Sequence, residues 1–363
     1  MVGCTRLGRA VPAGSPEGRA LWPEVCMNHR EFLQKVKSGE LGGAYLFEGT
    51  EENIKDSALA ALRKAVLPEG LEDMNCSMMD HPEADAIIAA AETLPFLGEK
   101  RLVIVRDQVG LGSRGECDEK LVSYMAQVPD STVLVFFHRG KADARKKLYT
   151  NIKKHGQIVA FDQLSEGELN QWIARKFAAL GKHCAPSVAS LLSFTTGSDT
   201  ALLNAEIEKL AALSGERETI EEADVRRLAT RSIEYTVFAM VDAVVEGREG
   251  KAFALMRDML TAGEERLGIL AMLLRQYRLL QHVKIMQFEK KSPQEIKKLL
   301  GVPSFAADKC IQQARAYTGG QVRRAVEICL ETELNVKSGK INQEGALEAA
   351  MLRIFALRQP QIV

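Results

Sequence analysis

Glu92-Thr-Leu-Pro-Phe-Leu-Gly-Glu-Lys-Arg-Leu-Val-Ile-Val-Arg-Asp107 joins a short apolar bend to an apolar run. The run, 102–105, is unbroken, which is typical of a strand buried on both faces of a parallel sheet. In the bend, Pro95 excludes a helix interior and Gly98 marks a turn. The apolar residues 94–97 therefore lie on a loop, and loops normally run over the surface. Either these side chains fold back onto their own core, or they are held out for another protein.

Composition excludes several broad classes. A chain of 363 residues can form two or three domains, each with its own core, and its apolar fraction of 46% is ordinary for a globular protein. The 48 basic and 48 acidic residues cancel, so any contact with nucleic acid must be local. Seven scattered cysteines without a CxxC pair predict no metal site and no disulfide framework, and they indicate a reducing cytoplasm. No apolar run reaches the length of a membrane span.

Strands that alternate with helices predict a parallel α/β domain over 27–163. The clearest apolar runs are 44–47, 102–105, 131–137 and 156–161, and 74–79 is a weaker one. Helical spacing is expected over 30–37, 54–66, 82–91, 120–127 and 143–154. Residues 1–26 are rich in Gly and Pro, so we expect a disordered leader there, and Met27 is a candidate second start.

The loop after the first of these strands has the layout of a phosphate-binding loop without its chemistry. The GxxxxGK[ST] motif needs a second Gly so that backbone amides face the phosphates, a Lys for charge, and a hydroxyl for magnesium. Gly49 and Lys55 are in register, but Ile54 replaces the second Gly and Asp56 replaces the hydroxyl residue. The acidic pair 51–52 adds charge that repels a polyphosphate. The pattern predicts a degenerate loop that binds no nucleotide; a βα turn of unrelated origin is the alternative.

Acidic residues that could hold a nucleotide-bound metal are also missing from the strand ends. Arg106-Asp107 follows one buried run and His138-Arg139 follows another, and neither supplies an acid pair. No Ser/His/Asp or Cys/His set has a spacing typical of catalysis. We therefore expect no intrinsic catalysis, no cofactor and no metal.

From 164 onward the pattern is helical throughout. Residues 164–232 predict a small module of four helices, which begins with the capping-box spacing of Ser165 and Glu168. Residues 233–363 predict a larger helical domain. Its helices are expected over 236–245, 250–261, 264–289, 293–300, 305–317, 319–339 and 345–357.

The order of these parts, with several short words of sequence, resembles the delta subunit family of bacterial DNA polymerase III clamp loaders. The resemblance extends over about 27–357. The words are Ala44-Tyr-Leu-Phe-Glu-Gly-Thr-Glu51, Thr93-Leu-Pro-Phe-Leu97, Arg101-Leu-Val-Ile-Val105, Asp143-Ala-Arg-Lys-Lys-Leu148, Asn204-Ala-Glu-Ile-Glu-Lys-Leu210, Leu274-Arg-Gln-Tyr-Arg278 and Val336-Lys-Ser-Gly339.

This resemblance implies an AAA+-like α/β domain with a degenerate P-loop, a small helical lid domain and a C-terminal helical collar domain. It implies a subunit that binds and opens the sliding clamp, the beta subunit, during DNA replication and has no ATPase activity of its own. The expected partners are the gamma/tau motor subunits, the delta-prime subunit and primed DNA, within a polymerase holoenzyme that is a nucleotidyltransferase. The clamp-binding wedge falls on Leu94, Pro95, Phe96 and Leu97.

Two basic groups are candidates for DNA contact. Lys337 and Lys340 flank a Ser-Gly turn, and Arg145, Lys146 and Lys147 lie on an expected helix. Either group could touch phosphates, or both could be solvated basic faces. Two rival functions stay open at this point: an active P-loop ATPase that grips phosphate with the lysine of its loop, and a helical scaffold unrelated to replication.

Overall fold

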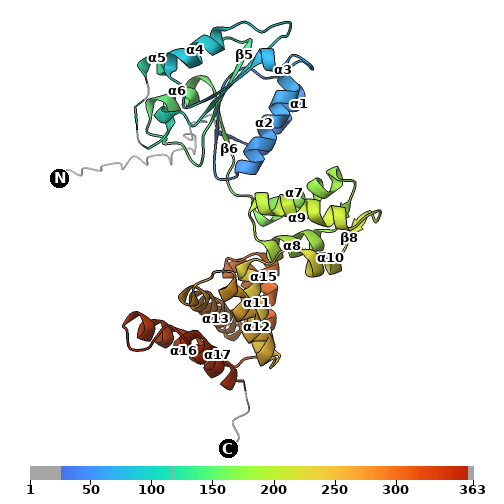
Figure 1. Ribbon diagram of the computed structural model, residues 1–363, viewed down its shortest axis with the longest axis vertical. Coiled ribbons are helices and arrows are strands. Elements are labelled where there is room, and N and C mark those ends of the chain that lie inside the picture. Colours follow the sequence, from blue (N-terminus) through green and yellow to red (C-terminus); the bar gives the residue numbers. More distant parts are fainter. Residues whose placement is uncertain (1–25, 114, 117, 359–363) are drawn as a thin grey trace, which may run out of the picture. The chain divides into compact units, whose positions relative to one another are not determined.

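The computed structural model describes residues 26–113, 115–116 and 118–358 (Figure 1). The chain forms two compact units, Met1–Gln163 and Leu164–Val363. Their division falls at the first expected domain boundary. The second expected boundary, at 232/233, lies inside the second unit. The predicted leader lies outside the described residues except for Cys26, which belongs to a strand.

The first unit is built on a six-stranded parallel sheet in the order β1-β6-β2-β5-β4-β3. Its strands are β1 (Cys26–Asn28), β2 (Gly43–Glu48), β3 (Cys76–Asp80), β4 (Arg101–Arg106), β5 (Thr132–Phe137) and β6 (Gln157–Ala160). Five of these were predicted from apolar runs. The run 102–105 forms the buried part of β4, with every side chain fully buried. β1 was missed because three residues are too few to display a pattern.

Helices cover both faces of this sheet, as Figure 1 shows. α1 (His29–Ser38) and α2 (Glu52–Val66) lie on one face; α4 (Ala84–Glu92), α5 (Glu119–Tyr124) and α6 (Lys147–His155) lie on the other. On the first face, Phe32 packs edge-on against Tyr45 and Phe47. On the second, alternate residues of the strands, among them Val103 and Val105, join the apolar faces of the three helices. The α/β prediction is confirmed.

Two short elements complete the connections of the first unit. α3 (Glu72–Asn75) precedes β3, and the 3-10 turn η1 (Val109–Leu111) follows β4. The weak strand predicted over 74–79 therefore begins two residues too early, because Met74 and Asn75 belong to α3. The bend of interest, residues 93–100, connects α4 to β4.

The second unit is helical and contains two apolar cores. The first core is formed by α7 (Glu166–Ala179), α8 (Pro186–Thr196), α9 (Thr200–Leu213) and α10 (Glu222–Leu228). A two-stranded parallel ribbon, β7 (His183–Cys184) and β8 (Thr219–Ile220), joins them and was not predicted. The Ser165 backbone amide donates to Glu168 Oε2 at 3.0 Å, so the predicted start of α7 is confirmed.

The second core belongs to seven helices that match the expected ranges within a few residues. They are α11 (Ile233–Val245), α12 (Glu249–Thr261), α13 (Arg266–Phe288), α14 (Pro293–Leu300), α15 (Ser304–Arg315), α16 (Gly319–Lys337) and α17 (Ala346–Ala356). None of the described helices combines the length and the apolar character needed to cross a membrane.

Candidate functional site

The bend between α4 and β4 holds three large apolar side chains in solvent. Leu94 and Leu97 are each 79% exposed and Phe96 is 49% exposed, while Pro95 is partly buried. Of the two alternatives for this bend, the structure adopts the one in which the side chains are held out. A folded protein rarely leaves so many large apolar side chains together without a partner.

Hydrogen bonds from a buried asparagine fix the backbone of this bend. The Phe96 amide donates to Asn75 Oδ1 at 2.6 Å, and Asn75 Nδ2 donates to the Phe96 carbonyl at 2.9 Å. A third bond joins Asn75 Nδ2 to the Leu71 carbonyl at 3.2 Å. Asn75 is fully buried, so its carboxamide has no access to water and would be costly to leave without these partners.

Arg101, at the start of β4, ties the neighbouring segments together. Its guanidinium donates to the Ala90 carbonyl at 3.0 Å, to the Met74 carbonyl at 3.1 Å and to Ser77 Oγ at 2.8 Å. The end of α4, the end of α3 and the start of β3 are therefore joined through one side chain. The bend emerges from a rigid base.

The bend itself has a constrained conformation. Leu97 has φ +49°, a left-handed conformation that costs a non-glycine residue about 1–3 kcal/mol. An added Cβ at position 98 would lie 2.9 Å from Pro68 Cγ, so this position, directly after Leu97, has room only for glycine. A bend held this firmly loses little conformational entropy when a partner binds, which favours affinity.

Sequence reasoning missed two residues of this site, Asn75 and Met74. Asn75 contacts a residue 21 positions away, so no local pattern reveals its role. Met74 precedes it and leaves a large apolar side chain exposed. Met74 was expected at the start of the weak strand over 74–79, so the sequence did not indicate that its side chain is exposed.

The loop predicted to be a degenerate phosphate loop follows β2, and two of its backbone amides donate to carbonyls of the first unit. Gly49 donates to the Gly140 carbonyl at 2.7 Å and Glu51 donates to the Phe161 carbonyl at 3.0 Å. Gly49 has φ +124°, and an added Cβ would lie 2.2 Å from the Phe161 carbonyl oxygen. Ile54 is buried beside these groups. Amides that already have acceptors cannot cradle a phosphate without rearrangement.

Lys55 is fully buried and its ammonium is bound within the first unit. Nζ donates to Glu52 Oε1 at 2.6 Å and to the His138 carbonyl at 2.7 Å, and it lies 5.0 Å from the centroid of the Phe137 ring. The charge that a phosphate loop directs at its ligand is neutralised here by the loop's own carboxylate. Lys55 thus connects α2 to the end of β5. The neighbouring Asp56 lies 3.7 Å from Arg106.

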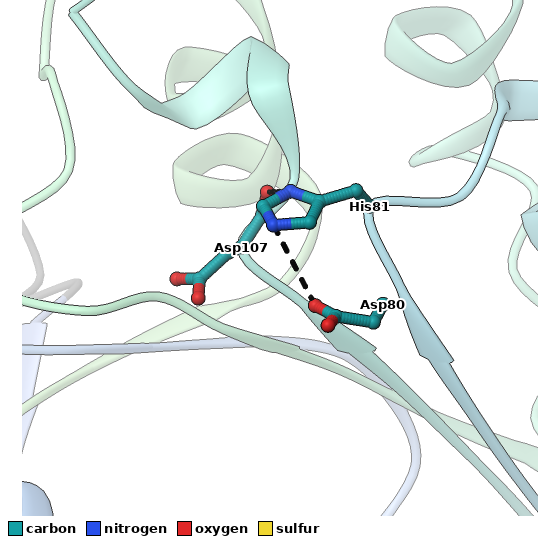
Figure 2. Close-up of side chains that lie close together, drawn as sticks. All are labelled: Asp80, His81 and Asp107. Atoms are coloured by element: carbon teal, nitrogen blue, oxygen red, sulfur yellow. Dashed lines mark hydrogen bonds and ion pairs between the residues drawn. The ribbon is translucent and has the colours of Figure 1, made fainter.

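A separate polar group lies at the carboxyl ends of β3 and β4 (Figure 2). The Asp80 and Asp107 carboxylates and a His81 ring nitrogen lie within 4.8 Å of one another, a donor set that suits a transition metal. However, the Asp107 carboxylate also accepts from the Arg139 amide at 3.0 Å and faces Arg139 Nε at 3.3 Å. Asp80 ends β3 and His81 directly follows it; both side chains are exposed, and we assign no ion to the group.

The predicted DNA-contact residues lie in different units. Lys337 ends α16 and donates to Glu333 at 2.5 Å, and Lys340 is exposed beyond the Ser-Gly turn. The helix predicted over 143–154 begins only at 147, because Asp143 takes part in a turn and chelates the Arg145 guanidinium at 2.9 and 2.8 Å.

Lys146 and Lys147, the other two members of this predicted DNA-contact group, also contact their own chain. Lys146 donates to the Gly115 carbonyl at 2.7 Å and Lys147 pairs with Glu119. Exposed pairs of this kind are worth little and exchange readily for a phosphate. Both groups of basic residues could therefore contact a phosphate, and the geometry does not favour one group over the other.

Comparison with known proteins places both units in one family. The model of the DNA polymerase III delta subunit matches residues 45–162, and the model of its C-terminal domain matches residues 234–354. The chain is 27% identical over 334 residues to DNA polymerase III subunit delta of Bacillus subtilis, covering 90% of this chain and 96% of the relative. It is 21% identical over 321 residues to the Escherichia coli subunit, covering 85% and 90%.

A solved structure agrees with these matches. The Bacillus subtilis DNA clamp loader delta protein aligns with a TM-score of 0.53 at 27% identity, over 90% of this chain and 99% of that one. The agreement extends over the α/β unit and the helical unit alike. The chain therefore belongs to the DNA polymerase III delta subunit family of bacterial clamp loaders.

Proposed function

We propose that this chain binds the sliding clamp through the bend of Leu94, Pro95, Phe96 and Leu97, and that it holds one interface of the clamp open. The observation that carries the proposal is the exposure of three large apolar side chains on a backbone that is hydrogen-bonded to the buried Asn75 side chain. Membership of the delta subunit family supports it. The receiving surface is an apolar pocket on the clamp.

The available apolar area limits the affinity of this contact. Burying the exposed parts of Leu94, Phe96 and Leu97 would contribute about 4–7 kcal/mol in total. Association costs about 4–15 kcal/mol, so these three side chains alone give at best weak binding. Contacts around the bend must add to them, and Met74, which is exposed and precedes Asn75 in the chain, is one candidate.

Opening the clamp requires more than affinity. A ligand shifts a conformational equilibrium only by the difference between its affinities for the two states. The bend must therefore fit the opened interface better than the closed one. A rigid bend suits this role, because a flexible one would adapt equally well to both states.

We further propose that this subunit neither binds nor hydrolyses ATP. Support comes from Lys55, whose ammonium is buried against Glu52, and from loop amides that already have acceptors. Nucleotide chemistry then belongs to the gamma/tau motor subunits. The rival function, an active P-loop ATPase, would require Lys55 to leave its pair and the loop to rearrange.

The second unit is proposed to join the motor and delta-prime subunits. Exposed apolar side chains on α16, on α17 and on their connection support this assignment, because they offer area for helix packing against another chain. These are Leu330, Leu334, Ile341 and Leu352.

A contact with primed DNA is proposed for Lys337 and Lys340, with Arg145, Lys146 and Lys147 as the second candidate group. Replacing Lys337 and Lys340 by alanine should weaken DNA binding by the assembled loader. It should also reduce the slope of log K against log salt concentration by about 2, if both lysines neutralise phosphates. An unchanged slope would mean that these lysines form a solvated face.

The central test is capture of the sliding clamp by the purified full chain. Phe96→Ala with Leu97→Ala should lower clamp affinity by about 100-fold or more, because truncating each central anchor costs about 2 kcal/mol or more. The matched control is Leu202→Ala with Leu213→Ala on α9, since both leucines are 58% exposed. Clamp binding by the first variant at wild-type strength would refute the proposal.

A further inference from the structure

Asn75 is a fully buried polar side chain whose hydrogen bonds all go to backbone groups of loops and short turns. It is the last residue of α3 and directly precedes the edge strand β3. The carboxamide accepts from the amide of Phe96 and donates to the carbonyl of the same residue. One side chain thus satisfies both backbone groups of the residue at the tip of the bend.

This pair of hydrogen bonds determines the direction in which the Phe96 side chain points. Its amide and carbonyl both face the carboxamide at the base of the bend, so the side chain cannot turn onto the same surface and remains 49% exposed. The left-handed conformation of Leu97 follows at once in the chain. Without the Asn75 side chain, the amide and carbonyl of Phe96 would lose their hydrogen-bond partners, and the bend could fold back onto the core of the first unit.

We infer that Asn75 is the positioning residue of the clamp-binding bend: it contacts no partner itself and holds Phe96 in the projecting conformation. The inference rests on the proposed function. The partner is an apolar pocket on the sliding clamp, and Asn75 contributes by removing the cost of ordering the bend on binding.

Asn75→Ala in the full chain tests this assignment. The expected result is a loss of clamp affinity of about tenfold or more, with Leu94, Phe96 and Leu97 all intact. Ile152→Val is the control for general destabilisation, because Ile152 is fully buried on α6 in the same unit and has no hydrogen bond to the bend. It should lower stability and leave clamp affinity unchanged.

Two further measurements separate positioning from a purely structural role. Hydrogen exchange at the Phe96 amide should be slow in the wild type and in Ile152→Val, and fast in Asn75→Ala. A double-mutant cycle of Asn75→Ala with Phe96→Ala should be strongly non-additive, because the positioning residue has nothing to position once the ring is gone. If Asn75→Ala does not fold, Asn75→Ser is used instead, since its hydroxyl cannot reach both Phe96 groups.

The outcomes distinguish this inference from the function on which it rests. If Phe96→Ala leaves clamp affinity unchanged, the proposed function is overturned. If Phe96→Ala weakens binding but Asn75→Ala does not, or if the two effects simply add, only the role of Asn75 is overturned. Loss of affinity together with fast exchange at Phe96 and a non-additive cycle supports the inference.

Discussion

Replacing Glu52 by alanine tests whether Lys55 is a structural cation or an idle phosphate ligand. The Lys55 ammonium is fully buried and has two oxygen partners, Glu52 Oε1 at 2.6 Å and the His138 carbonyl at 2.7 Å. Glu52→Ala leaves the positive charge buried with one neutral partner. Lys55→Met instead removes the charge and keeps most of the apolar volume.

The expected magnitudes differ in a diagnostic way. Breaking a buried ion pair costs about 3–5 kcal/mol, and because the Glu52 side chain is 46% exposed we expect about 2–3 kcal/mol for Glu52→Ala. Lys55→Met costs about 1–2 kcal/mol, chiefly because the His138 carbonyl loses its donor. The double variant should therefore be more stable than Glu52→Ala alone, since removing the lysine removes the unpaired charge.

The assay must report the first unit alone, because a chain of two compact units need not unfold in one step. Hydrogen exchange of the β2 and β5 amides at increasing urea concentrations gives this local free energy of unfolding. The reasoning is refuted if Glu52→Ala costs less than about 0.5 kcal/mol or if the double variant is the least stable. It is equally refuted if MgATP protects the wild-type first unit, since a bound ligand stabilises the state to which it binds.

Two further predictions concern a crowded glycine in the first unit and a paired carboxylate in the second. Gly49→Ala should destabilise the first unit by about 3 kcal/mol or more, because the added Cβ would lie 2.2 Å from the Phe161 carbonyl oxygen. Gly39→Ala is the control: it has open space around it and should cost only about 1–2 kcal/mol of backbone strain. The same hydrogen-exchange experiment compares the two variants. In the second unit, the hydrogen bond from Arg217 at 2.8 Å holds the pKa of Asp224 below its usual value. The ionised Asp224 carboxylate therefore stabilises the fold above about pH 4, and this contribution is lost as the pH falls. Asp224→Asn should therefore cost about 1–2 kcal/mol at pH 7, and urea unfolding should find the difference from wild type shrinking at acidic pH; a pH-independent difference would contradict this account.

Local patterns predicted the strands and most helices. The run at 102–105 was recognisable as β4 because residues buried on both faces of a sheet are all apolar. The helical ranges followed from apolar spacing and from caps such as that of Ser165. The start of α6 was misplaced because a turn at Asp143, bonded to Leu111, competes with the helix. The short strands β1, β7 and β8 were missed because two or three residues are too few to display a pattern.

The departure of the loop after β2 from the phosphate-binding motif was likewise visible in the sequence. Ile54 and Asp56 depart from the phosphate-binding motif at positions where the chemistry allows no substitute. The tertiary structure showed where the Lys55 ammonium lies and which groups it contacts. Its partner Glu52 was visible in the sequence as a nearby acid, but the His138 carbonyl, 83 positions away, was not.

The sequence by itself determined that residues 94–97 form an apolar bend, because Pro95 and Gly98 exclude regular structure there. It left open whether the bend turns inward or outward. Only the tertiary structure decided this, through the Asn75 carboxamide, the Arg101 guanidinium and the close approach of Gly98 to Pro68. The physical reason is that the direction of a loop depends on hydrogen bonds between segments brought together by the sheet, and no local propensity encodes them.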